Sequence, residues 1–170
     1  MHRGSHRRKG DLVQRTFSAR QATGPIVTAS ALVTPVPFSA RYDLDRRSGV
    51  ISRVGHPLQG ESISGRVLVS RGVQGGVAAG WALLALTARG NGFAGLIFGD
   101  TNPVMVQGAI AANIPIFAGV DDDFFQTVTT GDRLYLDPEQ RRITVAAQEP
   151  PAFANPHFPT LNSTIQDVTK

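Results

Sequence analysis

Residues 66–90 read RVLVSRGVQGGVAAGWALLALTARG, and this stretch decides the fold. Its first five residues form a compact apolar run that is typical of a buried strand, whereas residues 77–88 are rich in alanine and leucine, which favour a helix. Arg89 and Gly90 follow, as is common where a helix ends. The glycine-rich residues 71–76 are therefore expected to form a turn that joins a strand to a helix.

The same alternation continues toward the C-terminus. Residues 94–98 form another apolar run, and residues 102–113 begin with Asn-Pro, a pair that suits the cap and first position of a helix. Residues 114–118 are apolar again. This order predicts a β-α-β-α-β core. The further elements expected on this side are a short helix at 121–125 and a hairpin of residues 133–137 and 142–146.

Toward the N-terminus, residues 26–34 are rich in valine and small residues and predict a strand that ends at Pro35 and Pro37. A polar loop follows, and then a short strand at residues 50–54. A chain of 170 residues can bury one sizeable core but is short for two domains. We therefore expect three regions, namely a disordered basic tail at 1–21, a single folded domain at 22–148 and an irregular tail at 149–170.

The net charge of +4 is unevenly distributed along the chain. Residues 1–20 contain six bases and one acid, whereas the rest of the chain contains 11 bases and 12 acids. A basic terminal tail can bind nucleic acid or acidic surfaces. The nearly neutral remainder gives no further support for such a partner, so we expect a solvated tail and no role in nucleic-acid binding.

The chain contains no cysteine. Disulfides, thiol catalysis and any zinc or iron–sulfur site ligated by its own sulfur atoms are therefore excluded. No run approaches the roughly 18 apolar residues that span a bilayer, and the first residues lack the apolar stretch of a secretory signal. We expect a soluble, cytoplasmic protein without a membrane partner.

Three stretches of the sequence are more distinctive. Residues 56–69 read HPLQGESISGRVLV, an ordered series of turn-forming residues ahead of the buried strand. Residues 29–51 contain ASALV, PFS, DLD and SGVI in this order, and a looser match covers residues 103–112 with the Ile-Pro pair that follows at 114 and 115. Together these stretches resemble the small, swivel-domain subunit of the aconitase X family.

This resemblance implies an α/β fold, a swivelling β/β/α barrel like the mobile domain of aconitases. It also implies a hydro-lyase that dehydrates a hydroxylated carboxylic acid such as cis-3-hydroxy-L-proline or mevalonate 5-phosphate. In the family, cysteines of a large subunit bind the iron–sulfur cluster, so this chain would bind no metal and would form a lid over the partner's cluster. It would be inactive alone.

The sequence departs from the family at one point. In similar small subunits the strand leads into a loop whose serine resembles the catalytic serine of aconitase, but residues 76–80 here read GVAAG and contain no hydroxyl group. Glycines at the start of a helix still expose backbone N–H groups that can bind a carboxylate or phosphate. Substrate binding by this loop is therefore expected, whereas proton abstraction by a loop serine is not.

The candidate site residues lie in and around this loop. We propose Ser70 and Arg71, at the end of the strand, as catalytic candidates; Ser70 would need a basic neighbour to act. The candidate substrate-binding residues are His56, Gln74, Gly75, Gly76, Asn102 and Gln107.

Several of these residues have a simpler structural interpretation. The glycines can serve a tight turn alone, His56 can cap a backbone group, and Asn102 can cap the helix that it precedes. The aspartates at 121–123 are expected at a solvated helix start rather than at a metal, because consecutive side chains diverge. Trp81 is expected to be an anchor in the core or at an interface.

Three functions remain open from the sequence. The first is the small subunit of a heteromeric hydro-lyase. The second is a divergent paralogue whose complex catalyses another lyase or isomerase step without the loop serine. The third is a noncatalytic module that binds an anionic metabolite in the glycine loop. The first two require a large partner with cluster-binding cysteines, whereas the third predicts a metal-free protein that binds its ligand alone.

Overall fold

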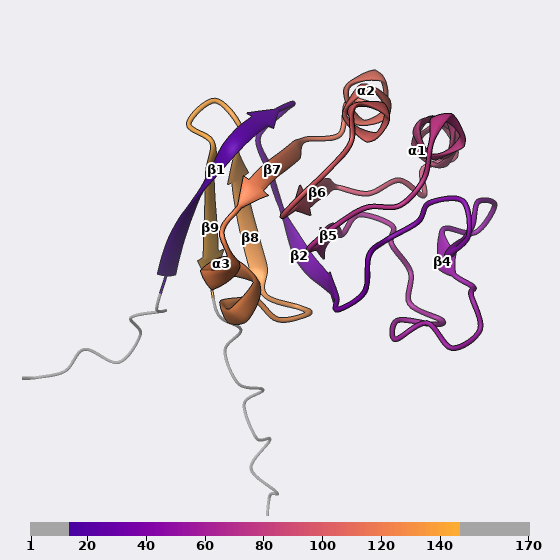
Figure 1. The fold of residues 1–170 in the computed structure, drawn as a ribbon, viewed down its shortest axis with the longest axis horizontal. Coiled ribbons are helices and arrows are strands. Elements are labelled where there is room, and N and C mark those ends of the chain that lie inside the picture. The colour runs from indigo at the N-terminus through magenta and orange to yellow at the C-terminus, as the bar shows by residue number, and fades with distance from the viewer. Residues whose placement is uncertain (1–13, 147–170) are drawn as a thin grey trace, which may run out of the picture.

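The computed structural model describes residues 14–146, and seven of its strands close into a barrel in the order β1-β7-β6-β5-β2-β8-β9 (Figure 1). Two further short strands, β3 and β4, form a small separate sheet. The elements are β1 (Gln14–Thr23), β2 (Val27–Thr34), β3 (Leu44–Asp45), β4 (Val50–Ile51), β5 (Val67–Ser70), α1 (Val77–Ala88), β6 (Gly95–Phe98), α2 (Pro103–Ala111), β7 (Ile116–Val120), α3 (Asp122–Thr127), β8 (Arg133–Asp137) and β9 (Arg142–Ala146).

The predicted β-α-β-α-β core is confirmed. Strands β2, β5, β6 and β7 pair in parallel, and helices α1 and α2 form the crossovers between β5, β6 and β7. Every residue of β5 and β6 is buried, which explains why both strands read as continuous apolar runs. The parallel arrangement brings the carboxyl ends of these strands to one edge of the sheet.

Alternate residues of the central strands enter two different apolar clusters. Leu68 packs beneath α1 and α2 with Leu83 and Met105, whereas Val67 and Val69 point into the barrel. Figure 1 shows the two helices together on one side of the barrel. The strands therefore connect the helix layer to the barrel interior, and both faces of the parallel sheet are covered.

The predicted N-terminal boundary is wrong. Residues 14–21, which we assigned to the basic tail, belong to β1, which pairs with β7 on one side and β9 on the other and so closes the barrel. Most side chains of β1 are exposed, and its apolar residues are few, so the strand lacks the alternation by which strands are recognised. Pairing with two neighbours stabilises it instead. Residues 1–13 and the predicted tail at 149–170 lie outside the described residues.

The C-terminal hairpin matches its prediction, with β8 and β9 at the expected residues. Helix α3 lies beside it and places Phe124, which is fully buried, in the barrel interior against Phe17 of β1 at 5.3 Å between ring centroids. Phe17 thus packs inside the fold and is not part of a solvated tail. Within residues 14–146, no helix is long and apolar enough to cross a membrane.

Helices α1 and α2 touch backbone to backbone. A Cβ atom added at Gly108 would lie 2.4 Å from the Cα atom of Gly80, and one added at Gly80 would lie 3.2 Å from the carbonyl oxygen of Val104. The contact at Gly108 leaves no room for a Cβ atom, and the contact at Gly80 is tight. This close approach draws the helices together and leaves a groove along the line where they meet.

Replacing Gly108 by alanine should destabilise the fold by roughly 1–3 kcal/mol, because the added methyl group forces the two helix backbones apart. Urea unfolding followed by circular dichroism would measure the change. Gly72→Ala is the matched control, since an added Cβ there meets no atom within 4 Å. Equal stability of the two variants would contradict this account of the helix contact.

Candidate functional site

Two loops meet where the parallel strands end. Residues 71–76 connect β5 to α1, and residues 99–102 connect β6 to α2. The backbone N–H of Gly99 donates to the carbonyl oxygen of Ser70 at 3.2 Å, and that of Asp100 donates to the carbonyl oxygen of Arg71 at 2.9 Å. The carboxyl edge of such sheets is where α/β proteins commonly bind ligands.

A third segment supports the glycine loop from the other side. The backbone N–H of Phe38 donates to the carbonyl oxygen of Gly72 at 3.1 Å, and the N–H of Gln74 donates back to the carbonyl oxygen of Phe38 at 2.7 Å. Phe38 itself is fully buried beneath α1 and stacks edge-on against Phe93. The loop is therefore held by a core residue rather than left free at the surface.

Ser70, one of the two catalytic candidates, is buried at the end of β5. Its side chain is fully buried, and its hydroxyl oxygen lies 2.8 Å from the carbonyl oxygen of Gly72 and 3.2 Å from that of Val36, so its single proton is donated to one of these two acceptors. Among residues 14–146, the hydrogen-bond partners of its hydroxyl group are all backbone groups, and none is a histidine, lysine or carboxylate. The hydroxyl joins the ends of β2 and β5, and we do not retain Ser70 as a proton-transferring group.

Arg71 is half-exposed and held in place from α3. Its guanidinium group forms an ion pair with Asp122 and lies over the ring of Phe125, with the Cζ atom 5.1 Å from the ring centroid. A guanidinium group donates hydrogen bonds and does not accept protons at physiological pH. Arg71 is therefore suited to bind a carboxylate or phosphate, not to act as a base.

Asn102 connects the two loops. Its side-chain oxygen accepts a hydrogen bond from the backbone N–H of Met105 at 2.9 Å, which confirms the predicted helix cap. Its side-chain nitrogen donates to the carbonyl oxygen of Gly75 at 3.1 Å. Because both ends of the amide are engaged, Asn102 positions the glycine loop and leaves little capacity for a ligand.

The remaining loop candidates face solvent. Gln74, Gly75 and Gly76 are exposed, and Gly76 precedes α1 without any side-chain hydrogen bond to cap the helix. Gln107 is exposed on α2 and lines the groove between the helices together with Val77, the first residue of α1. The loop and the groove are thus neighbouring parts of one surface.

His56 lies apart from the glycine loop. Its side chain is buried, its Nδ1 atom accepts a hydrogen bond from the backbone N–H of Leu58 at 3.0 Å, and its Nε2 atom lies 3.7 Å from a carboxylate oxygen of Asp43. It therefore caps a backbone group, which is the alternative considered for it, and no ligand could reach it in this arrangement. Burial lowers the pKa of His56 from its usual value of 6.5, although the Asp43 carboxylate acts in the opposite direction.

This lowered pKa predicts a pH dependence of stability. The unfolded chain binds a proton at His56 at a higher pH than the folded chain, so stability is lost as pH falls through the unfolded value of 6.5. The difference in unfolding free energy between the wild type and His56→Gln should narrow below this pH, by at most about 1.4 kcal/mol per pH unit for one proton. Urea unfolding of both proteins at pH values from about 8 to about 5, in steps of about one unit, would measure this difference. A constant difference would exclude this role.

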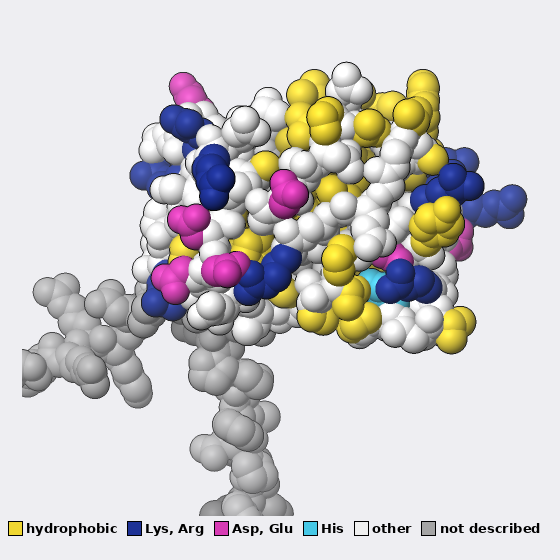
Figure 2. Space-filling model, in the orientation of Figure 1, with side chains coloured by type: hydrophobic (Ala, Val, Ile, Leu, Met, Phe, Trp, Pro, Cys, Tyr) yellow, Lys and Arg dark blue, Asp and Glu magenta, His cyan; other side chains and the backbone are white. Residues whose placement is uncertain are grey.

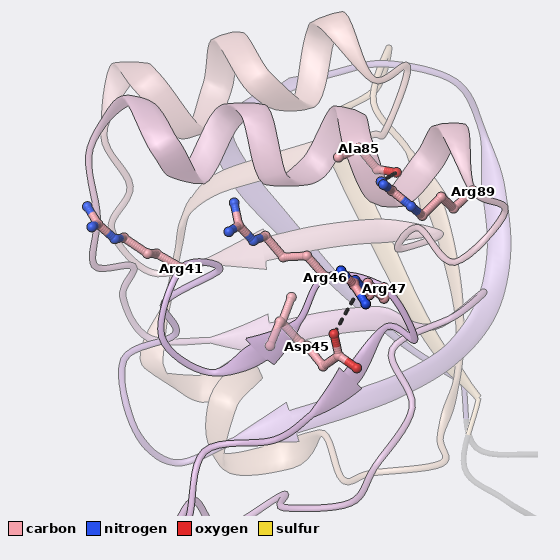
Figure 3. Close-up of a pocket in the computed structure, with 7 residues that line it drawn as sticks. Arg41, Asp45, Arg46, Arg47, Ala85 and Arg89 are labelled. Carbon is pink, nitrogen blue, oxygen red and sulfur yellow. Dashed lines mark hydrogen bonds between the residues drawn. The ribbon is translucent and has the colours of Figure 1, made fainter.

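Sequence reasoning missed a cluster of arginines. Arg41, Arg46, Arg47 and Arg89 line a hollow of about 420 Å³ between the loop after β2 and the C-terminal end of α1, together with Asp45 (Figure 3). The Arg-Arg pair at 46 and 47 was a visible signal, but the approach of Arg89 depends on the tertiary fold. Asp122 and Phe125 were missed as partners of Arg71 for the same reason.

The residues present do not fit a metal centre. The chain has no cysteine, and residues 14–146 contain no group of three histidine, aspartate or glutamate side chains placed to hold an ion. The aspartates at 121–123 are exposed, and one of them pairs with Arg71. An iron–sulfur cluster would have to be held by another chain.

The sequence of the folded region matches a known protein family. The model of the aconitase X swivel domain matches residues 16–145, nearly the whole described chain. The chain belongs to the aconitase X swivel-domain family. The predicted family is therefore confirmed.

Two similar relatives are small subunits of a dehydratase. The phosphomevalonate dehydratase small subunit of Methanopyrus kandleri is 31% identical over 112 residues, which cover 66% of this chain and 83% of that protein. The subunit of the same name from Archaeoglobus fulgidus is 31% identical over 124 residues, covering 73% of this chain and 93% of that protein. These relatives are subunits of a dehydratase, in agreement with the predicted hydro-lyase class.

Two solved structures share the fold. The holo-form of Thermococcus kodakaraensis aconitase X aligns with a TM-score of 0.73 at 22% identity, over 78% of this chain and 99% of that chain. The solution structure of a UPF0107 protein aligns with a TM-score of 0.73 at 28% identity, over 78% of this chain and all of that one. The predicted α/β swivel barrel is thus confirmed.

Proposed function

We propose that this chain is the small subunit of an aconitase X-type dehydratase that removes water from a hydroxylated carboxylic acid, with mevalonate 5-phosphate as its substrate. The observation that carries the proposal is the likeness to phosphomevalonate dehydratase small subunits along nearly their whole length. The substrate offers two anionic groups, a carboxylate and a phosphate. A site with an oriented arginine beside exposed backbone N–H groups suits such a molecule.

In this proposal Arg71 binds an anionic group of the substrate. Asp122 and Phe125 hold its guanidinium group at the mouth of the loop, so less side-chain freedom is lost when the ligand binds. Gln74 and the backbone at Gly75 and Gly76 offer further donors at the same edge. Asn102 and Phe38 maintain the shape of the loop.

The large subunit would supply what this chain lacks. Its cysteines would bind the iron–sulfur cluster, which when bound supplies a Lewis acid for the leaving hydroxyl group. This chain would act as a lid that covers the substrate and excludes water. The proton acceptor would also come from the large subunit, because residues 76–80 carry no hydroxyl and Ser70 is buried.

Co-expression with the large subunit of the same organism, followed by purification without oxygen, would test the proposal. We expect an iron-containing heteromer that dehydrates mevalonate 5-phosphate, while each subunit alone is inactive. Activity with cis-3-hydroxy-L-proline alone would show that the proposed substrate is wrong and that the proposed dehydration reaction is right. A heteromer inactive on both would favour a divergent paralogue, and a metal-free chain that binds phosphate alone would favour an anion-binding module.

Within the active heteromer, Arg71→Met should raise the KM for the substrate about tenfold to a hundredfold, because a charge-assisted bond to an anionic group is lost. Steady-state kinetics would measure the change. Arg133→Met, which removes an exposed arginine from β8, is the control and should behave as the wild type. An unchanged KM in Arg71→Met would remove Arg71 from the substrate site.

A further inference from the structure

The outer surface of α1 and α2 contains an apolar groove. Its volume is about 330 Å³, and its floor is the close contact between Gly80 and Gly108. Its walls include Val77, Trp81 and Leu84 from α1. Because the helices meet at glycines, the larger side chains on either side stand above the contact, and those of Val77 and Trp81 remain exposed.

The exposed apolar side chains of this surface are large. Trp81 and Val77 are each 67% exposed and Ile110 is 57% exposed. Figure 2 shows apolar side chains gathered over the region where Figure 1 places the two helices. The structure therefore excludes the core role considered for Trp81 and leaves the interface role. An exposed tryptophan beside a groove is the typical anchor of a protein interface.

The other flank of α1 is strongly basic. Leu84 faces the groove, whereas the adjacent Ala85 lines the arginine hollow, so one helix separates the two features. The guanidinium groups of Arg41, Arg46, Arg47 and Arg89 form no ion pair with a carboxylate of residues 14–146. Figure 3 shows Arg89 on the α1 side of the hollow and Arg46 and Arg47 on the loop that faces it, whereas the side chain of Arg41 extends outward at its edge.

Asp45 lies among these arginines and offsets only one of their four positive charges. Its carboxylate accepts hydrogen bonds from the backbone N–H of Arg47 at 2.9 Å and from the hydroxyl of Ser48 at 2.7 Å. The four exposed arginines therefore concentrate positive charge in one place, although they repel one another. A partner with carboxylates would relieve that repulsion and make charge-assisted bonds.

The groove also continues into the candidate site. Val77 follows the exposed Gly76, and Gln107 lines the groove from α2. Gln74, Gly75 and Gly76 are exposed and line neither the groove nor the arginine hollow. A protein seated on α1 and α2 would cover this open loop, so the position of the groove favours the partner that completes the site.

We propose that the α1–α2 groove and the neighbouring arginine hollow form one docking surface for the large subunit. The partner presents an apolar ridge that fits against Trp81 and carboxylates that bind the arginines. This inference rests on the proposed function, since it names the partner of the same site. Apolar contacts at the centre supply affinity, and the charged flank supplies orientation and speed of association.

The test measures binding of the purified large subunit to variants of the full chain by calorimetry and stopped-flow. Trp81→Ala should weaken binding at least thirtyfold, as loss of a central anchor does. The double variant Arg46→Glu/Arg47→Glu should slow association at least tenfold, with a weaker dependence on salt. Val54→Ala, which removes an apolar side chain that is 86% exposed outside the groove, is the control and should bind as the wild type.

The outcomes separate this inference from the proposed function. If the wild-type chain does not bind the large subunit, both fail. If the wild type binds and both variants bind equally well, the proposed function stands and the docking surface is wrong. Sedimentation of the chain alone covers a further case, because a dimer that Trp81→Ala dissociates would assign the groove to a second copy and overturn the inference.

Discussion

Replacing Gly75 by valine should lower the dehydratase activity of the assembled enzyme about 100-fold while the chain remains folded. Gly75 has a φ of +126°, in the region that side-chain-bearing residues rarely adopt, and an added Cβ would lie 3.3 Å from the Cβ of Ala79. The valine side chain is branched at its Cβ atom and therefore crowds the backbone further. The loop must therefore shift, and its backbone donors shift with it.

The neighbouring glycine provides a matched control. Gly76 has a φ of −112°, and an added Cβ there meets no atom within 4 Å, so Gly76→Ala keeps the backbone. Its activity should remain within a few-fold of the wild type, while the Gly75 variant loses the carbonyl position that Asn102 binds. Steady-state kinetics, with circular dichroism as the check on folding, would measure both. Similar activity of Gly75→Val and the wild type would show that loop geometry is not needed for turnover.

Replacing Asp43 by alanine should destabilise the fold by roughly 3 kcal/mol. Asp43 is fully buried, accepts a hydrogen bond from the backbone N–H of Ser39 at 2.7 Å and lies 2.9 Å from the guanidinium group of Arg53. Without this carboxylate, the buried backbone N–H of Ser39 loses its acceptor, and the side chain of His56 loses its neighbouring negative charge. The segment next to Ser39 supports the glycine loop through Phe38, so activity should fall as well.

Asp45→Ala is the control for this effect, because Asp45 lies in the same arm of the chain, residues 35–66 between β2 and β5, but is exposed. Backbone N–H donation from Arg47 lowers the pKa of Asp45, yet its carboxylate remains in water. Urea unfolding should show only a small change for this variant. An equal loss of unfolding free energy in both variants would mean that the arm is sensitive to any change of charge, and that burial of the Asp43 carboxylate is not the cause of the effect.

These two variants connect the distinctive sequence segments to the loop. His56 of the HPLQG segment, Ser39 of the PFS segment and Asp43 are buried and form a polar cluster beneath the arm. The cluster fixes Phe38, and Phe38 fixes the backbone at Gly72 and Gln74. The segments that contain the candidate residue His56 therefore support the position of the glycine loop through Phe38.

Local pattern was sufficient for the central elements. The apolar runs and the alanine-rich segment placed β5 and α1, and the Asn-Pro pair placed the start of α2, because these signals depend on residues a few positions apart. Of these segments, residues 66–69 and 103–112 also belong to the stretches that resemble the family. The hairpin of β8 and β9 followed from alternation and a turn.

Only the tertiary structure revealed strand β1 and the burial and contacts of the candidate site residues. The polar β1 is stabilised by partners about 100 and 125 residues away in sequence, Ala118 and Thr144 among them, and no local pattern records such pairing. Burial of Ser70, the pairing of Arg71 with Asp122 and the approach of Arg89 to Arg46 arise only when distant loops meet at the barrel edge and beside α1. Sequence determines which side chains are present and which segments bury their apolar faces, whereas the closed barrel decides which polar groups share a surface, because contacts between distant residues are set by packing of the whole chain.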